Sequence, residues 1–436
     1  MKRVLLVVAS MTFLVGSGVF SPTAPAAGGL GMPSVTSAGT WGGIRYVEYD
    51  GIFAGTTSTG GYRVPYRITA PGDPERGNGT VLVEPPHFAS GTGTLDQALG
   101  RDFLFSRGFS HASVGYSTTD FGDGANLRIL DPSVRGVFIH GGFDDEGGRT
   151  DDEIIVDFAR ALTSDPFARR MLGTVGRRYL TGFSDSSVPV LRLVTSGLAD
   201  RVFDVALPYT ATTGPYGSWD GPDPQAALAA GRFAGKLVIV NSENEGTSAP
   251  LVDRGVVPRQ YRFYAVAGSP HVPDFLVPFF SNETSPASFQ PELRARFLQA
   301  HDWVIRGEAP PASTHLLAAG GDTLARDASG NAISVDVRGR LMPRLPFVEL
   351  GEAHFVSDFL GSYDGVKTIA QLGFNSPGQY LRAFAGRLAA YADAGGILRE
   401  DAAAMLRRAA LCPPLTYTET YRDHYDRFVA VQPCGR

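Results

Sequence analysis

Residues 179–187 have the sequence YLTGFSDSS, in which a short apolar strand runs into a Gly-x-Ser-x-Ser turn. A helical pattern follows at residues 190–198. A sharp strand-to-helix turn forces its serine into a strained backbone conformation, and the residues two before and two after must be small to avoid collision. Gly182 and Ser186 hold those two places, although glycine is usual at the second. The stretch therefore predicts that Ser184 is a nucleophile at the carboxyl end of a strand.

A similar pattern, GFSHA, occurs at residues 108–112. It lies between a predicted helix and a predicted strand, which is the reverse order. Ser110 would then lie at the opposite end of the sheet, away from a catalytic pocket. We therefore expect Ser184, and not Ser110, to be the nucleophile.

Strands and helices alternate along the chain on both sides of residue 184. Alternating apolar and polar residues predict long strands at 44–55 and 62–71. Helical patterns at 95–107, 154–162 and 190–198 separate shorter apolar strands, which are expected at 79–84, 111–116, 179–181, 202–207, 237–240 and 261–266. This order favours an α/β fold with a mainly parallel sheet covered by helices on both faces.

A serine nucleophile needs a histidine base and a carboxylate that orients it, here in the chain order serine, acid, histidine. The histidines after Ser184 are His271, His301, His315, His354 and His424. His271 follows the strand at 261–266 after a short loop, which places it at the carboxyl edge of the sheet. His301 falls inside a predicted helix, and the other three lack a preceding strand of the sheet. His271 is therefore the predicted base.

The orienting acid is expected at the end of the strand that precedes the histidine strand. Glu243 and Glu245 both follow the strand at 237–240. Glu243 is preferred, but an extended segment would place both side chains on similar faces, so the spacing leaves Glu245 open. Asp204 is a weaker third candidate.

An oxyanion needs two hydrogen-bond donors. The backbone N–H of Asp185, directly after the nucleophile, is expected to be one. The loop after the strand at 79–84 should supply the other, and because Pro85 and Pro86 have no N–H, the donor would be His87 or Phe88. His87 has two further interpretations, as a residue of the substrate pocket or as an exposed loop residue.

These residues resemble the α/β-hydrolase superfamily, and within it a bacterial branch described only as an α/β-hydrolase domain, without an agreed substrate. The matching motifs are Gly182–Ser186, Glu243-Asn244-Glu245, Val266–His271, Trp303-Val304 with Gly307 and Pro310-Pro311, and Arg326-Asp327 with Gly330-Asn331. The resemblance covers roughly residues 45 to 410. It implies an α/β-hydrolase fold with Ser184 as nucleophile, His271 as base and the Glu243/Glu245 pair as acid. The branch often has Asp where Glu245 stands.

Residues 43–436 are expected to form one domain. Residues 209–235 are rich in Gly and Pro and are interpreted as a cap insertion, in which Tyr209, Tyr216 and Trp219 would contact the substrate. An ordinary surface excursion is the alternative. Residues 285–436 are expected to be a mostly helical elaboration.

The amino-terminal end of the chain suggests export. Residues 1–26 have a basic start, a short apolar run and a small-x-small pattern, which is typical of a secretory signal peptide. Residues 27–42 are expected to be a flexible lead-in. Cys412 and Cys434 are the only cysteines and are predicted to form a disulfide in an exported protein, with two free thiols as the alternative. No segment predicts a membrane span in the mature chain.

Composition limits the remaining classes of function. The 436 residues carry 39 basic and 44 acidic side chains, a net charge of −5, which makes nucleic acid an unexpected partner. No glycine-rich nucleotide loop or metal-ligand spacing occurs, so no cofactor and no metal site are expected. The sequence therefore predicts an exported serine esterase acting on a small-molecule or lipid-like ester. Amide hydrolysis or acyl transfer on the same residues is one alternative, and a non-catalytic binding protein on the same fold is another.

Overall fold

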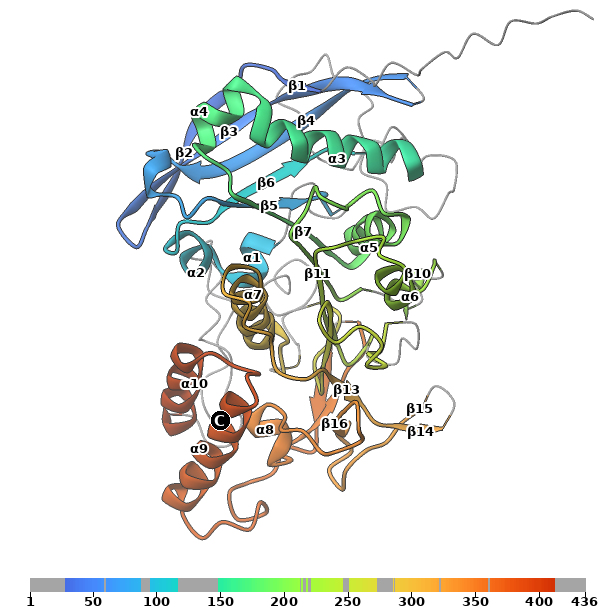
Figure 1. The fold of residues 1–436 in the computed structure, drawn as a ribbon. Helices are drawn as coiled ribbons and strands as arrows, with labels where there is room; N and C mark the ends of the chain where they lie inside the picture. Colours follow the sequence, from blue (N-terminus) through green and yellow to red (C-terminus); the bar gives the residue numbers. More distant parts are fainter. Residues whose placement is uncertain are drawn as a thin grey trace, which may run out of the picture.

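The computed structural model describes residues 28–58, 60–87, 95–116, 148–211, 213–214, 217–218, 221–245, 251–272, 285, 287–320, 323–359 and 361–411. Its largest feature is a sheet of twelve strands in the order β1-β3-β4-β6-β5-β7-β8-β11-β12-β13-β16, with β2 paired to β3 (Figure 1).

The seven strands in the middle of this sheet run parallel to one another. Most of their residues are buried, as expected for parallel strands covered on both faces. In sheet order they are β6 (Ser110–Val114), β5 (Thr80–Glu84), β7 (Arg177–Phe183), β8 (Val205–Tyr209), β11 (Lys236–Ser242), β12 (Tyr261–Val266) and β13 (Thr314–Leu316). The predicted, mainly parallel sheet is confirmed, and its carboxyl ends meet at one edge.

Antiparallel strands from the amino-terminal part of the chain extend the sheet at one edge, and Figure 1 shows them in blue. They are β1 (Gly29–Leu30), β2 (Ser34–Trp41), β3 (Ile44–Thr57) and β4 (Gly60–Pro71). The expectation of a flexible lead-in is therefore wrong for residues 28–42. Strand β2 pairs with β3 along its length, and the Trp41 ring packs 5.7 Å from Tyr46 and 5.0 Å from Phe105.

Helices cover both faces of the parallel strands. On one face, α5 (Ser187–Ser196) packs on β7 and β8 and contacts α3 (Gly148–Ser164) and α6 (Pro224–Ala229). On the other, α7 (Gln290–Ile305) packs on β8 and β11 and contacts α1 (Leu95–Leu99). The helix expected at 95–107 is divided into α1 and α2 (Arg101–Phe105), because Gly100 takes a φ of 86°, which is incompatible with a continuous helix.

The helix α4 (Pro166–Leu172) shows how local sequence sets an element boundary. The Asp165 carboxylate accepts the N–H groups of Phe167 (2.7 Å) and Ala168 (3.3 Å), and Pro166 occupies the first turn, where no N–H is needed. The cap residue and the proline together set the residue at which α4 begins.

The section after residue 285 differs from the mostly helical expectation. Its described residues form helices α7, α8 (Pro346–Glu349), α9 (Pro377–Asp393) and α10 (Arg399–Leu411). They also form short strands: β13, β14 (Ala318–Gly320), β15 (Thr323–Leu324), β16 (Ser334–Asp336), β17 (His354–Val356) and β18 (Ser362–Asp364). Because β13 pairs with β12 and β16 with β13, the main sheet continues into this section (Figure 1).

Several predicted features lie outside the described residues: the signal segment 1–26, Phe88, Tyr216, Trp219, Cys412, Cys434 and His424. Between β8 and β11, where a cap was expected, the described residues form α6 and the short strands β9 (Thr213–Gly214) and β10 (Gly217–Ser218). Among the helices that the structure describes, none has the length and apolar character needed to cross a membrane.

Candidate active site

The chain turns sharply at Ser184, directly after β7. Ser184 has a φ of 51°, in the left-handed region that residues with a side chain rarely adopt. The residues Ser184–Ser186 form a 3₁₀ turn that leads into α5. A Cβ atom on Gly182 would lie only 2.1 Å from the Ser186 carbonyl oxygen, so this position requires glycine. The strained strand-to-helix turn that the sequence predicted is confirmed.

Ser186, which stands where glycine is usual, fits this turn for a local reason. Its φ of −72° lies in the ordinary right-handed region, so a side chain causes no strain. Its hydroxyl accepts the Phe183 N–H and lies against the Phe183 carbonyl oxygen, each at 2.9 Å. Ser187 adds a 2.5 Å hydrogen bond to the Ser184 carbonyl oxygen. The serines of the turn therefore hold the backbone around residue 184.

His271 lies beside Ser184 at the carboxyl edge of the sheet. Its Nε2 is 2.8 Å from Ser184 Oγ, and the residue is only 4% exposed. Its ring lies 5.5 Å from the Phe183 ring and stacks on Phe359 at 5.0 Å with an interplanar angle of 18°. The serine and histidine that the sequence singled out are thus in hydrogen-bond contact.

The carboxylate next to His271 belongs to Glu245. Its Oε1 lies 2.5 Å from His271 Nδ1. A carboxylate only accepts, so Nδ1 carries the proton and Nε2 is left to accept the Ser184 hydroxyl. Burial disfavours the charged carboxylate, but the charge of His271 and hydrogen bonds from His271, Asn244 and Ser242 outweigh it and hold the pKa of Glu245 below its usual value.

Glu243, the preferred acid, has different partners. Its Oε2 accepts the Gly268 N–H at 2.5 Å, and its Oε1 lies 3.0 Å from the Arg326 guanidinium. The sequence spacing left the choice open, because an extended segment would place both carboxylates on similar faces. The chain instead turns directly after β11, at Glu243–Glu245, and separates the two carboxylates. The structure brings Glu245, and not Glu243, to His271. Asp204 lies before β8 and accepts the Arg178 N–H at 3.0 Å.

His87 lies within the site and is not an exposed loop residue. It is 7% exposed, and its ring packs 5.2 Å from that of Phe183. Burial, reinforced by the neighbouring charge of His271, lowers the pKa of His87 to about 3, so its imidazole is neutral. This position fits the interpretation of His87 as a pocket residue.

Asp185 follows the nucleophile at the amino end of α5. Backbone N–H groups at such a helix start point toward a developing negative charge. Burial raises the pKa of the Asp185 carboxyl to about 6, and His271 partly opposes this shift. The side chain therefore titrates close to neutral pH.

A buried carboxylate under the site was missed by the sequence reasoning. Glu84, at the end of β5, accepts the Leu95 N–H at 2.9 Å and lies 2.8 Å from His111 Nε2 and 3.4 Å from the Tyr209 hydroxyl. The signal was an acidic residue ending an otherwise apolar strand. Burial opposes protonation of His111, yet its hydrogen bond to Glu84 and nearby carboxylates raise its pKa.

The expectation that Tyr209 contacts a substrate is not met. Its side chain is completely buried and packs 5.3 Å from the Phe183 ring. It therefore supports the turn from within the core.

The other serine and histidine candidates lie elsewhere. Ser110 begins β6 opposite Val81, near the amino end of β5, whereas Ser184 follows the carboxyl end of β7. In α7, His301 Nδ1 is hydrogen-bonded to the Tyr179 hydroxyl at 2.8 Å. His315 lies in β13 and His354 in β17. No group of three His, Cys, Asp or Glu side chains suited to a metal ion occurs among the described residues.

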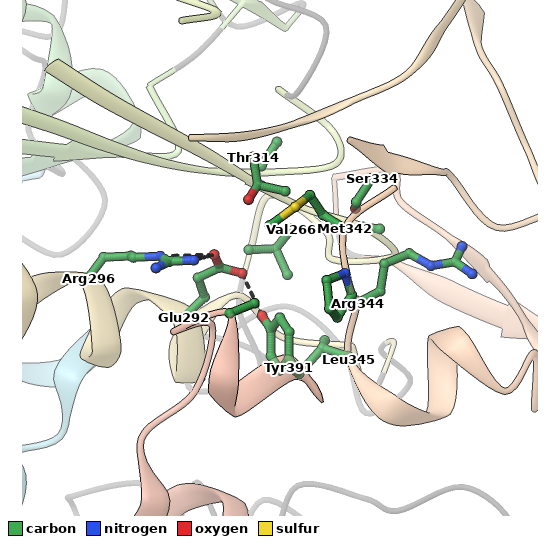
Figure 2. Close-up of a pocket in the computed structure, with 13 residues that line it drawn as sticks. Val266, Glu292, Arg296, Thr314, Ser334, Met342, Arg344, Leu345 and Tyr391 are labelled. Carbon is green, nitrogen blue, oxygen red and sulfur yellow. Dashed lines mark hydrogen bonds and ion pairs between the residues drawn. The ribbon is translucent and has the colours of Figure 1, made fainter. Parts of the chain in front are cut away.

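A separate pocket lies between β12, α7, α9 and residues 342–345. Figure 2 shows Glu292 pointing toward Arg296 and Tyr391 in it. Glu292 pairs with Arg296 at 2.7 Å and accepts the Tyr391 hydroxyl at 2.5 Å, and Arg296 also lies 3.7 Å over the Tyr264 ring. Because its charges are paired internally and Ser184 and His271 do not line it, we do not assign chemistry to this pocket.

Comparison with known proteins gives one family and several distant structures. A model of the alpha/beta hydrolase domain matches residues 51–407. A search of curated proteins gave no match. An S-formylglutathione hydrolase from Agrobacterium tumefaciens is 9% identical, with a TM-score of 0.34 over 54% of this chain and 91% of that chain. A putative dienelactone hydrolase from Klebsiella pneumoniae is 14% identical, with a TM-score of 0.29 over 48% and 77% of the two chains. A glucuronoyl esterase from Solibacter usitatus is 13% identical, with a TM-score of 0.30 over 51% and 70%.

Proposed function

Because this chain belongs to the alpha/beta hydrolase domain family, we propose that it is a serine hydrolase that cleaves carboxylic esters. The observation that carries the proposal is the chain of contacts from Ser184 Oγ to His271 Nε2 at 2.8 Å and from His271 Nδ1 to Glu245 at 2.5 Å. A nucleophile, a base and an orienting acid in this order are the requirements of acyl transfer by a serine.

In the proposed mechanism, His271 Nε2 accepts the hydroxyl proton as Ser184 Oγ attacks the ester carbonyl. The tetrahedral intermediate collapses when His271 returns this proton to the leaving alcohol, which leaves an acyl group on Ser184. Water then attacks the acyl carbon with His271 again as base. The second tetrahedral intermediate breaks its bond to Ser184 Oγ, which takes the proton back from His271, and the acid product leaves. Glu245, kept ionised by its lowered pKa, stabilises the imidazolium and fixes the Nδ1–H tautomer.

The oxyanion is proposed to be held by two backbone N–H groups. Asp185 supplies one from the amino end of α5, where the helix favours negative charge. The loop after β5 supplies the other, from His87 or Phe88. The buried position of His87 next to Phe183 supports this loop as a wall of the site.

Export and the disulfide remain part of the proposal and rest on the sequence alone. The signal segment 1–26 predicts that the mature protein begins near residue 27 and works outside the cytoplasm. Cys412 and Cys434 would then be joined. Intact-mass measurement of the mature protein, before and after reduction, tests both statements.

A fluorophosphonate probe tests the proposed nucleophile without knowledge of the substrate. Peptide mapping should find the probe on Ser184 in the wild type and no adduct in Ser184→Ala, whereas Ser110→Ala should be labelled like the wild type. Ser184→Ala should also abolish cleavage of p-nitrophenyl esters with little change in Tm. Labelling at another residue, or activity that survives Ser184→Ala, would refute the proposal.

A further inference from the structure

Glu243 has no part in the proposed chemistry, yet it is buried at the edge of the site. It is 2% exposed, and its Oε2 accepts the Gly268 N–H at 2.5 Å. Gly268 begins the histidine loop, residues 268–272, which carries His271. A buried carboxylate requires a compensating charge, because losing its hydration is costly.

Arg326 supplies that charge from the C-terminal section. One guanidinium nitrogen lies 3.0 Å from Glu243 Oε1, without the alignment of a hydrogen bond, so the contact is an ion pair. The Arg326 side chain is 40% exposed, whereas that of Glu243 is fully buried. The pair therefore connects the carboxyl end of β11 to a segment more than eighty residues further along the chain.

The turn that begins at Arg326 also fixes the segment that backs His271. Asp327 Oδ1 accepts the N–H groups of Ser329 and Asn331 at 2.8 and 3.1 Å. The Asn331 amide donates to the Ala353 carbonyl oxygen and accepts the Phe355 N–H, each at 2.9 Å. The turn at residues 326–331 thus holds the strand β17.

Residues just after β17 contact the histidine loop directly. The Val272 N–H donates to the Phe359 carbonyl oxygen at 2.8 Å, and the His271 N–H lies 3.4 Å from the Asp358 carbonyl oxygen. The Phe359 ring stacks on the imidazole. At the start of the loop, a Cβ atom on Gly268 would lie 3.2 Å from Phe355, so the two segments are closely packed.

We propose that Glu243 and Arg326 are positioning residues, which act together as a clamp that holds the histidine loop so that His271 Nε2 stays within reach of Ser184. This inference rests on the proposed function. Without Arg326 the buried Glu243 carboxylate is uncompensated and relaxes toward solvent, which weakens its hold on the Gly268 N–H. Displacement of a catalytic group by about 1 Å can cost roughly 100-fold in rate.

The clamp is tested by the rate at which a fluorophosphonate labels Ser184 in the full-length protein. Arg326→Gln and Glu243→Gln should each slow labelling roughly 10- to 100-fold. The double variant should be no slower than the slower single variant, because the two residues act through one contact. Arg340→Gln is the matched control: it removes a mostly exposed arginine that pairs with Asp336, and it should label at the wild-type rate.

A pH profile separates positioning from a general loss of structure. The midpoint of the acid limb of labelling should move down in Glu243→Gln, which removes a negative charge near the imidazole, and up in Arg326→Gln, which removes a positive one. Opposite shifts support the clamp. Slower labelling with a lowered Tm and an unmoved midpoint would show a structural role only and overturn it.

The outcomes also separate this inference from the proposed function. If the wild type is labelled at Ser184 and Arg326→Gln is labelled equally fast, the clamp is wrong while the esterase proposal stands. If the wild type is not labelled at all, the proposed function fails and the clamp fails with it. Since Arg326 is partly exposed, its variant remains informative even if Glu243→Gln does not fold.

Discussion

Replacing Glu245 with glutamine tests the proposed acid, and the hydrogen bonds around Glu245 allow the expected loss of kcat to be calculated. Glutamine keeps the shape of the side chain but removes its charge and replaces one oxygen with an amide nitrogen. If the nitrogen faced His271, Nδ1 would have to accept, the proton would move to Nε2, and Ser184 would lose its base. In serine proteases such a tautomer change costs about 10⁴-fold in kcat.

The environment of Glu245 selects the other orientation. Asn244 Nδ2 donates to Oε1, the oxygen that faces His271, at 2.6 Å, whereas Ser242 Oγ lies 2.5 Å from Oε2. A hydroxyl can accept as well as donate, but an amide nitrogen such as Asn244 Nδ2 can only donate. In the Glu245→Gln variant the amide carbonyl oxygen therefore remains next to His271 and Asn244, and the correct tautomer is kept.

The transition-state stabilisation that Glu245→Gln loses is then the contribution of the charge alone. Two unit charges roughly 4 Å apart interact by about 4 kcal/mol at an effective dielectric constant of about 20. A hydrogen bond to a charged group contributes about 1.5–3 kcal/mol. A loss of about 3 kcal/mol in transition-state stabilisation corresponds to roughly 100-fold in kcat for p-nitrophenyl ester hydrolysis.

The matched control is Glu352→Gln, which changes another fully buried glutamate, hydrogen-bonded to Tyr380, and should leave kcat nearly unchanged. Adding Asn244→Ala to Glu245→Gln removes the constraint on the amide and should lower kcat further. A Glu245→Gln enzyme within threefold of the wild type would refute the assignment of the acid. A fall near 10⁴-fold would refute the orientation argument.

Three further predictions concern the turn and its neighbours. Burial raises the pKa of Asp185 to about 6 from 3.8, so its charged form lowers stability above that pH, and this cost disappears as the pH falls toward 4. Asp185→Asn should therefore raise the free energy of unfolding by about 1–2 kcal/mol at pH 8 and by almost nothing at pH 4. Equal melting shifts at both pH values would contradict this. Gly182→Ala places a methyl group 2.1 Å from the Ser186 carbonyl oxygen. It should therefore lower the free energy of unfolding by about 3 kcal/mol in chemical denaturation and nearly abolish fluorophosphonate labelling. A variant that labels normally would show that the turn is not needed in this form. With a pKa lowered to about 3 by burial, His87 stays neutral between pH 5 and 9, so His87→Gln should change the rate without moving the midpoint of the acid limb, and a moved midpoint would place a titrating His87 in the mechanism.

The sequence predicted those features that depend on short-range rules. The turn at Ser184 follows from the steric requirement for Gly182, and His271 follows from the position of a loop after a recognisable apolar strand. The alternation of strands and helices was enough to predict the parallel sheet, because each element carries its own periodicity.

Features that depend on the path of a loop or on distant partners were harder to predict. The choice between Glu243 and Glu245 depends on a turn directly after β11, which a short polar segment does not specify. Strand β2 is polar and mostly exposed, so its pairing with β3 and the packing of Trp41 left little periodic signal. Glu84 stands in an apolar strand, and its burial is explained by partners that the fold brings to it, among them the Leu95 N–H, His111 and Tyr209.

The contact between Phe359 and His271 has a consequence for the order in which the molecule matures. Synthesis from the amino terminus completes serine, acid and histidine well before the residues that back the imidazole. A nascent or prematurely terminated polypeptide therefore contains every reacting group in an unsupported arrangement. Under the mechanism proposed, hydrolytic competence therefore waits for residues as far as Phe359, and loss of the final third of the chain would leave a latent protein.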